Sequence, residues 1–239
     1  ARAAALDAWA WTACGWLSRA EPIGQQMLDT LYTCLIQDAR LGMHAAHALR
    51  VLTLHSRLVS PSRGFVVRRL YRQRTMETML VAVTEALEGR CAGGEPCLVA
   101  MATLLPGATD ALVSMHLTTW LPLLVHTLGM DDAPVRLTCA RTLQRIVSSE
   151  HAAALAEHLP LLVPRLLDAA ATPQAPRLRV AALQALQALT DAVPAAHLDA
   201  YRRQVVQALG RPHRGVDDAV RAVRTAAVDC RAAWYATQE

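Results

Sequence analysis

The sequence predicts an all-α fold, a right-handed α-solenoid of stacked helix pairs, on three observations. Leucine, alanine and valine supply most of the apolar residues, whereas aromatic residues make up only 4% of the 239 residues. Leucine and alanine favour helices because they lose little side-chain freedom there. No long stretch alternates apolar and polar residues, as a half-buried strand would. The third observation is an internal repeat whose period of about 40 residues is typical of helical solenoids.

The repeat is clearest in a segment that opens with an apolar residue followed by arginine. One copy spans residues 135–146, and a second spans 178–189, 43 residues later; both end in Leu-Gln, one variable residue and an apolar residue. A shorter third copy covers 223–228, 45 residues after the second. Because apolar positions recur with helical spacing, we expect each copy to form the second helix of a pair.

A different element precedes each of these helices. It reads Leu-Pro-Leu-Leu-Val from Leu121 and again from Leu159, and a degenerate copy ends at Leu209 with Arg203 in the place of the proline. These segments predict first helices with proline in their opening turns. Aspartates in the turns that follow would interact favourably with the start of the second helix. We therefore expect helix pairs near residues 111–149, 151–193 and 195–237.

The first half of the chain follows the same plan less regularly. It predicts helix pairs near residues 22–58 and 72–105, and a lone second helix at 4–19. Together these elements predict one solenoid over residues 1–239 with about five and a half repeats, the C-terminal part of a longer array. Arrays of this kind need polar ends. The interleaved charges of the last helix, expected at residues 217–235, indicate a C-terminal cap. Three tryptophans indicate an edge that an upstream repeat would cover: Trp9, Trp11 and Trp16.

The combination of these features resembles the HEAT-repeat family. That family has two helices per unit, a proline in the first helix, an aspartate in the turn and a Val-Arg pair in the second helix. The resemblance covers Leu112 to Tyr235. It implies a scaffold that holds other proteins together.

Composition and motifs do not favour catalysis or binding to nucleic acid. All 24 basic residues are arginine, and 20 carboxylates leave a scattered net charge of +4, which does not favour binding by bulk charge. The uncharged stretch 111–130 contains two histidines and a proline, so it reads as parts of two helices rather than a membrane span. There is no phosphate-binding glycine loop, zinc-protease helix or nucleophile elbow. We therefore expect no enzyme and no cofactor.

Two residue pairs are weaker candidates for a metal site. His44 and His47 are one helical turn apart, but two nitrogens without a third ligand favour ordinary helical histidines. Cys91 and Cys97 flank a Gly-Gly pair with a spacing wider than that of zinc sites, which favours a loop with incidental thiols. The six cysteines are otherwise scattered, as expected for core thiols rather than cluster ligands.

Two arginine- and tyrosine-containing segments are candidates for partner docking. Residues 63–74 hold five arginines together with Phe65 and Tyr71. Arginine and tyrosine are enriched where interfaces carry their binding energy. The alternatives are a solvated helix with its apolar side against the solenoid, or an RNA-binding segment. The candidate docking residues in this segment are Arg68, Arg69, Tyr71, Arg72 and Arg74.

The second candidate is the C-terminal edge of the array. Its alternative is structural, because a terminal Trp-Tyr pair can fill the last hydrophobic layer of a capping helix. The candidate docking residues at this edge are Tyr201, Arg202, Arg203, Arg224, Trp234 and Tyr235.

The tail carries a narrower resemblance. Segments 178–190, 201–209 and 223–234 are similar to the C-terminal HEAT domain of the methyl-methanesulfonate-sensitivity and nucleotide-excision-repair scaffold family, and segments 70–74 and 96–128 agree. The chain departs from that pattern at Arg202 and Thr225, where the family has lysines, and at Arg203, where it has proline.

This resemblance implies a subunit of the cytosolic iron–sulfur assembly targeting complex. Its expected partners are the iron–sulfur targeting adaptor, the adaptor's β-propeller partner and client apoproteins of DNA replication and repair, in the cytoplasm and the nucleus. The alternatives are a transport receptor, a phosphatase scaffold or a nucleic-acid-binding HEAT module.

Overall fold

The structure is a computed structural model that describes residues 2–38, 40–53, 60–64, 68–89, 94–147 and 149–237. These residues form eleven α-helices joined by short 3-10 helices and turns, with no strand among them, so the all-α class is confirmed. None of the described helices has both the length and the apolar character that a membrane crossing requires. The chain divides into two compact units, Ala1–Thr109 and Asp110–Glu239.

The first unit is built from five α-helices of unequal length. Helix α1 packs against α2, α3 and α4, while α5 packs against both α3 and α4. Helix α2 shows why the sequence folds in this way: a proline stands at its first position, and Met27, Leu28, Leu31 and Leu35 form one buried stripe. The helices are α1 (Arg2–Ser18), α2 (Pro22–Gln37), α3 (Gly42–Ala48), α4 (Arg69–Glu88) and α5 (Gly94–Leu104).

The helix expected up to Leu58 is shorter. Helix α3 ends at Ala48 and continues as the 3-10 helix η1 (Leu49–Leu52), while Ala39 and residues 54–59 lie outside the described residues. A further 3-10 turn, η2 (Pro61–Arg63), precedes α4, and η3 (Leu105–Gly107) follows α5. Helix α4 begins at Arg69, three residues before the expected start, so the arginine-rich segment belongs to the helix from that point.

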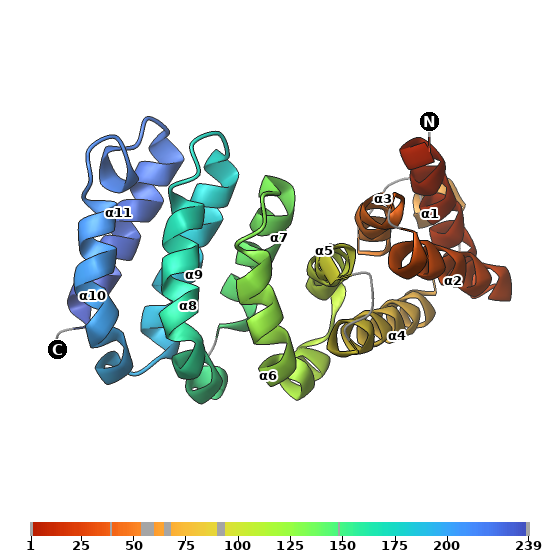
Figure 1. Ribbon diagram of the computed structural model, residues 1–239, viewed down its shortest axis with the longest axis horizontal. Helices are drawn as coiled ribbons and strands as arrows, with labels where there is room; N and C mark the ends of the chain where they lie inside the picture. Colours follow the sequence, from red (N-terminus) through yellow and green to blue (C-terminus); the bar gives the residue numbers. More distant parts are fainter. Residues whose placement is uncertain are drawn as a thin grey trace. The chain divides into compact units, whose positions relative to one another are not determined.

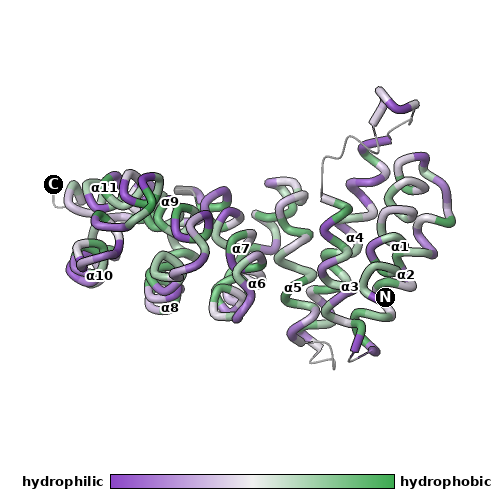
Figure 2. The backbone as a smooth tube through the Cα atoms, turned by 90° about the horizontal axis from the view of Figure 1, so that it is seen from above, coloured by the Kyte–Doolittle hydropathy of each residue, from purple (hydrophilic) through white to green (hydrophobic). Residues whose placement is uncertain are grey.

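The second unit consists of six α-helices in two layers (Figures 1 and 2). The first helices of the pairs form one layer and the second helices form the other, where α9 packs against α7 and α11. Alanines Ala181, Ala182 and Ala185 on α9 are buried, and their small side chains allow the close approach of these helices. The first layer is α6 (Asp110–Thr127), α8 (Ala152–Ala170) and α10 (Ala195–Leu209); the second is α7 (Ala133–Ile146), α9 (Pro176–Ala192) and α11 (Arg221–Ala236).

The prolines of the first helices lie inside the helices rather than in their opening turns. Pro122 stands within α6, and Pro160 and Pro164 stand within α8. Pro122 and Pro160 are exposed, so water can reach the carbonyl groups that proline leaves without a helical partner. The proline of the repeated Leu-Pro element therefore lies on the solvent-exposed side of the first helix in both pairs that contain it.

The turn aspartates have two different roles. Asp132 caps α7 as expected, and its carboxylate accepts a hydrogen bond from the Val135 amide at 3.0 Å. Asp218 does not cap α11, which begins only at Arg221, after the 3-10 helix η5 (Gly215–Asp217). Its side chain is buried instead, in contact with the preceding repeat.

Candidate partner-docking surfaces

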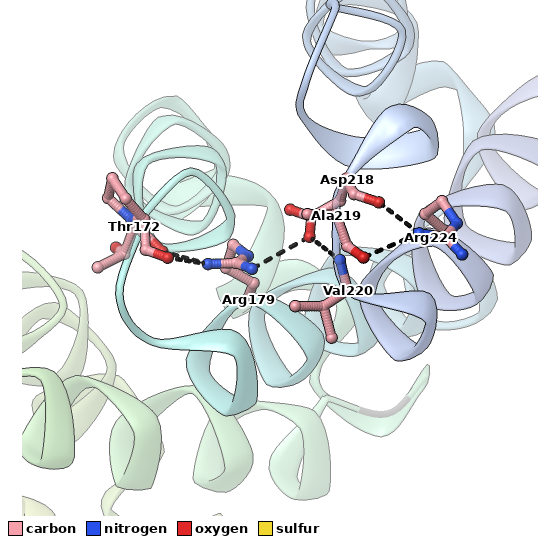
Figure 3. A network of polar contacts seen from close by, with 7 residues as sticks. Thr172, Arg179, Asp218, Ala219, Val220 and Arg224 are labelled. Atoms are coloured by element: carbon pink, nitrogen blue, oxygen red, sulfur yellow. Dashed lines mark hydrogen bonds and ion pairs between the residues drawn. The ribbon is translucent and has the colours of Figure 1, made fainter.

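A buried polar network joins the last two repeats (Figure 3). Arg179, the arginine of the repeated apolar-Arg pair in α9, donates through Nη2 to Asp218 Oδ1 at 3.1 Å, and both side chains are 8% exposed. The other guanidinium nitrogen, Nη1, donates to the carbonyl oxygens of Thr172, at 2.9 Å, and Pro173. One side chain thus links the turn of its own repeat to the turn of the next.

The same network immobilises Arg224. The Asp218 carboxylate also accepts from the Val220 amide at 2.8 Å, and Arg224 Nη1 donates to the carbonyls of Asp218 at 2.7 Å and Ala219 at 3.0 Å (Figure 3). Arg224 therefore holds the turn before α11, and only part of its side chain reaches solvent.

Trp234 is fully buried. Its Nε1 donates to the Leu186 carbonyl of α9 at 3.0 Å. Of the two interpretations that the sequence left open for this residue, the structure supports the one in which it fills the last hydrophobic layer. Its side chain offers no surface to a partner.

Arg202 also contacts the protein itself. Its Nε donates to Thr237 Oγ1 and its Nη2 to the Thr237 carbonyl, both at 3.1 Å, and it pairs with Asp199. Thr237 is the capping residue that follows the last residue of α11, so Arg202 ties α10 to that end. Arg202 was expected to dock a partner, but much of its hydrogen-bonding capacity is used within the fold.

A partly exposed strip lies along one side of α11, where Val228 and Tyr235 are exposed and Arg231 is half-buried. Val228 is 53% and Tyr235 48% exposed, and the Arg231 guanidinium lies 5.5 Å from the centre of the Tyr235 ring. These residues directly follow the buried Ala227, Cys230 and Trp234, so they lie about 100° around the helix from its buried side. We call Val228, Arg231 and Tyr235 the α11 strip. Of the other residues expected at this edge, Tyr201 is half-buried and Arg203 is exposed, both on α10.

A second exposed group lies at the start of α4. Arg68, Arg69 and Arg74 are exposed, as is Leu70 at 79%, while Tyr71 is half-buried. We call Arg68, Arg69, Leu70 and Arg74 the α4 patch. Phe65 lies outside the described residues.

Arg72 is different from its neighbours in the α4 patch. Its Nε donates to the Leu52 carbonyl at 3.0 Å, and its Nη2 donates to the carbonyls of Leu52 at 2.6 Å and Val51 at 3.3 Å. These carbonyls end η1, so Arg72 satisfies the end of that helix with a positive charge. This candidate docking residue thus has a clear structural role.

His44, His47 and Cys97 are the described members of the two candidate metal-binding pairs. His44 is exposed, His47 is half-buried, and Cys97 is buried, while Cys91 lies outside the described residues. Within the part of the chain that the structure describes, no three histidine, cysteine or acidic side chains are grouped as metal ligands.

Several cysteines are buried thiols. Burial raises the pKa of Cys14, although the nearby Arg72 charge and a hydrogen bond with Ser18 oppose the shift. Burial alone raises the pKa of Cys139, whose Sγ donates to the Leu124 carbonyl at 3.1 Å, and it raises the pKa of Cys230 to about 12. Such thiols are poor nucleophiles, because the thiolate is the reactive form.

The sequence did not reveal the surroundings of Arg203. This residue lines a pocket of about 470 Å³ between α8 and α10, together with Arg211 and Arg214 from the following loop. The only sequence signal was a turn with two arginines, Gly210 to Asp218, because the facing wall comes from α8, more than 30 residues earlier.

A comparison with protein families shows to which family the chain belongs. The family described as "RNAPII transcription regulator C-terminal" matches residues 1–190. The chain belongs to this family. The scaffold family suggested by the tail motifs is thereby confirmed.

Individual relatives agree with this assignment. The chain is 28% identical over 97% of its length to the Schizosaccharomyces pombe "DNA repair/transcription protein mms19", and 28% identical over 95% to the human "MMS19 nucleotide excision repair protein homolog". A DNA repair/transcription protein of Saccharomyces cerevisiae is 29% identical over 58% of the chain and 13% of its own length. The chain spans 22% of the length of the first two relatives. The family is thus one of DNA repair and transcription proteins.

Proposed function

We propose that the chain is a non-catalytic protein-interaction scaffold that docks the adaptor of the cytosolic iron–sulfur assembly targeting complex. Membership of a repair and transcription family supports this role, and so does the resemblance of the tail. The observation that carries the proposal is the α11 strip, where Tyr235 and Arg231 are presented on a helix fixed by buried Trp234. Tyrosine and arginine on a rigid element are typical anchors of protein interfaces.

The proposed partners are the adaptor, its β-propeller partner and the iron–sulfur client apoproteins of DNA replication and repair. The role of the scaffold is to bring the adaptor and the clients together, in the cytoplasm and the nucleus. The family match does not support the transport receptor or the phosphatase scaffold as alternatives.

The test is capture of the purified adaptor by the full chain, with variants chosen from exposed side chains. Trp234→Ala and Arg72→Glu are unsuitable, because either change would disturb the fold. Tyr235→Ala and Arg74→Glu remove exposed groups from the α11 strip and the α4 patch. If Tyr235 is an anchor, its removal weakens binding about 30-fold, the effect of a typical interface hot spot.

Gln184→Ala and Arg40→Glu are the matched controls, because both residues are exposed and lie outside the two surfaces. We expect both controls to bind the adaptor like the unchanged chain. Absence of adaptor binding at about 10 μM would overturn the proposal, since an interface of about 1,600 Å² normally binds more tightly. Equal binding by all variants would show that neither the α11 strip nor the α4 patch contacts the adaptor.

A further inference from the structure

A pocket of about 470 Å³ lies between the ends of α8 and α10. Pro164, Leu167 and several alanines give it an apolar lining, while Gln204 and Gln207 of α10 contribute amides. Figures 1 and 2 show α8 and α10 side by side in the same layer. The volume lies within the range of ligand pockets, about 300–1,000 Å³.

The loop that closes one side of this pocket is held in a defined conformation. Gly215 has a φ of +54°, and a Cβ added there would lie 2.2 Å from the Leu209 carbonyl oxygen, so glycine is required. Asp217 accepts a hydrogen bond from the His213 amide at 2.7 Å and donates its own amide to the Arg214 carbonyl at 2.9 Å. The buried Asp218 then fixes the loop to α9. The arginines on this loop are thus carried by an ordered backbone.

Three arginines line the pocket, and one carboxylate is present. The arginines are Arg203, Arg211 and Arg214, and the carboxylate is Asp168. Among the described residues, none of these three guanidinium groups forms an ion pair. The pocket therefore holds a local excess of positive charge that the fold itself does not neutralise.

We propose that this pocket binds an acidic peptide segment of a partner protein. Carboxylates of the segment pair with Arg203, Arg211 and Arg214, whose planar guanidinium groups suit bidentate contacts. The aliphatic parts of the segment pack on Pro164 and Leu167, and the amides of Gln204 and Gln207 bind its main chain.

Charge favours a peptide over a nucleic acid in this pocket. The second unit contains thirteen arginines and twelve acidic residues, so no broad basic surface continues from the pocket. A nucleic acid backbone needs such a track of positive charge. Asp168 in the wall would also repel a phosphate, whereas a peptide can place a neutral or basic residue beside it.

The experiment measures fluorescence anisotropy of a labelled 12-residue peptide, six glutamates interspersed with alanine and leucine, with the complete chain. A second peptide with glutamine at each glutamate position and a 12-nucleotide single-stranded RNA are the comparison probes. We expect the glutamate peptide to bind and the glutamine peptide to bind at least about tenfold more weakly, with affinity that falls as salt rises.

Two double variants complete the experiment. Arg211→Glu with Arg214→Glu should weaken binding of the glutamate peptide at least about tenfold. Arg141→Glu with Arg177→Glu changes the net charge equally at exposed positions outside the pocket, and it should retain most of the binding. Circular dichroism establishes that both variants are folded.

Equal binding of the two peptides, or an equal loss in both double variants, would overturn the proposal. Tighter binding of the RNA, lost in the Arg211 and Arg214 variant, would also overturn it and assign the pocket to nucleic acid. The proposal goes beyond adaptor docking and is independent of it. Its failure would leave the test at Tyr235 and Arg74 unaffected.

Discussion

Arg179 and Asp218 form an ion pair in the core of the last two repeats, and each residue has further partners there. Asp218→Ala would leave the buried Arg179 charge without its carboxylate and the Val220 amide without its acceptor. We expect a loss of about 3–5 kcal/mol in the free energy of unfolding, the usual result of breaking a buried pair. Urea unfolding followed by circular dichroism measures the change.

Asp191→Ala is the control for this prediction, because it removes an exposed carboxylate from the same unit. It should change the free energy by less than about 0.5 kcal/mol. If Asp218→Ala behaves like Asp191→Ala, the ion pair does not stabilise the fold.

The cysteines should differ in reactivity according to burial. With a pKa of about 12, only about one Cys230 thiol in ten thousand is ionised at pH 8. Cys34 is only half-buried, so iodoacetamide at pH 8 should modify it at least about tenfold faster than Cys139 or Cys230. Peptide mapping by mass spectrometry measures each rate. Equal rates for Cys34 and Cys230 in the native protein would contradict the burial of α11.

At the scale of elements, Trp234 determines how α11 is attached to α9. Trp234→Ala would leave a large cavity and remove the hydrogen bond to Leu186, at a cost of about 3–5 kcal/mol. Trp234→Phe retains most of the volume and should cost about 1–2 kcal/mol. Thermal unfolding of the two variants separates the contributions of packing and hydrogen bonding. Tyr235→Ala, on the exposed side of the helix, should cost less than either.

Arg72 and Arg74 provide a similar comparison within α4. Arg72→Ala removes three hydrogen bonds to the carbonyls that end η1, so we expect a loss of about 1–3 kcal/mol. Arg74→Ala removes an exposed side chain and should change stability by less than about 0.5 kcal/mol. Chemical denaturation checks both. Equal effects would mean that the contacts of Arg72 are not stabilising.

Arg72 and Arg74 show which property of the site the sequence does not predict. Arg72 and Arg74 have the same chemistry and sit in one arginine-rich segment, so no local pattern separates them. The difference arises because the end of η1, 20 residues earlier, meets only one of them. Asp218 is the same case, since its partner Arg179 is 39 residues away. The sequence placed Asp218 among the charges of the cap that closes the array, whereas the structure shows its side chain buried against the preceding repeat.

The positions of the helices could be predicted from the sequence better than the roles of individual side chains. The apolar-Arg segments at residues 135, 178 and 223 all lie in second-layer helices, because helical spacing of apolar residues depends only on local sequence. The start of α11 was placed too early because Asp217 and Asp218 resemble residues that open a helix. Their backbone amides instead donate to the carbonyls of Arg214 and Gly215 and form the η5 turn.

At the scale of the whole molecule, the strength of the repeat differs between the two units. The clear motifs, from residue 112 onward, fall in the second unit, whose helices form regular layers. In the first unit, α3 has only seven residues and continues as a 3-10 helix, so the period is interrupted. An irregular element has no counterpart in the next repeat, and a search for periodicity therefore cannot locate it.

The low net charge of the whole chain predicts weak binding to nucleic acid. Twenty-four arginines are offset by twenty carboxylates, so few phosphates could be neutralised at once. Since binding to nucleic acid depends on how many counterions are released, we expect a dissociation constant weaker than about 10 μM for a 20-nucleotide single strand at 150 mM salt. Fluorescence anisotropy at several salt concentrations measures both the affinity and its salt dependence.

Tighter binding with a steep salt dependence, lost when Arg69 and Arg74 are changed to glutamate, would instead identify the α4 patch as a nucleic-acid surface. Arg40→Glu with Arg50→Glu controls for the loss of charge alone, because both arginines are exposed in the same unit but outside the patch.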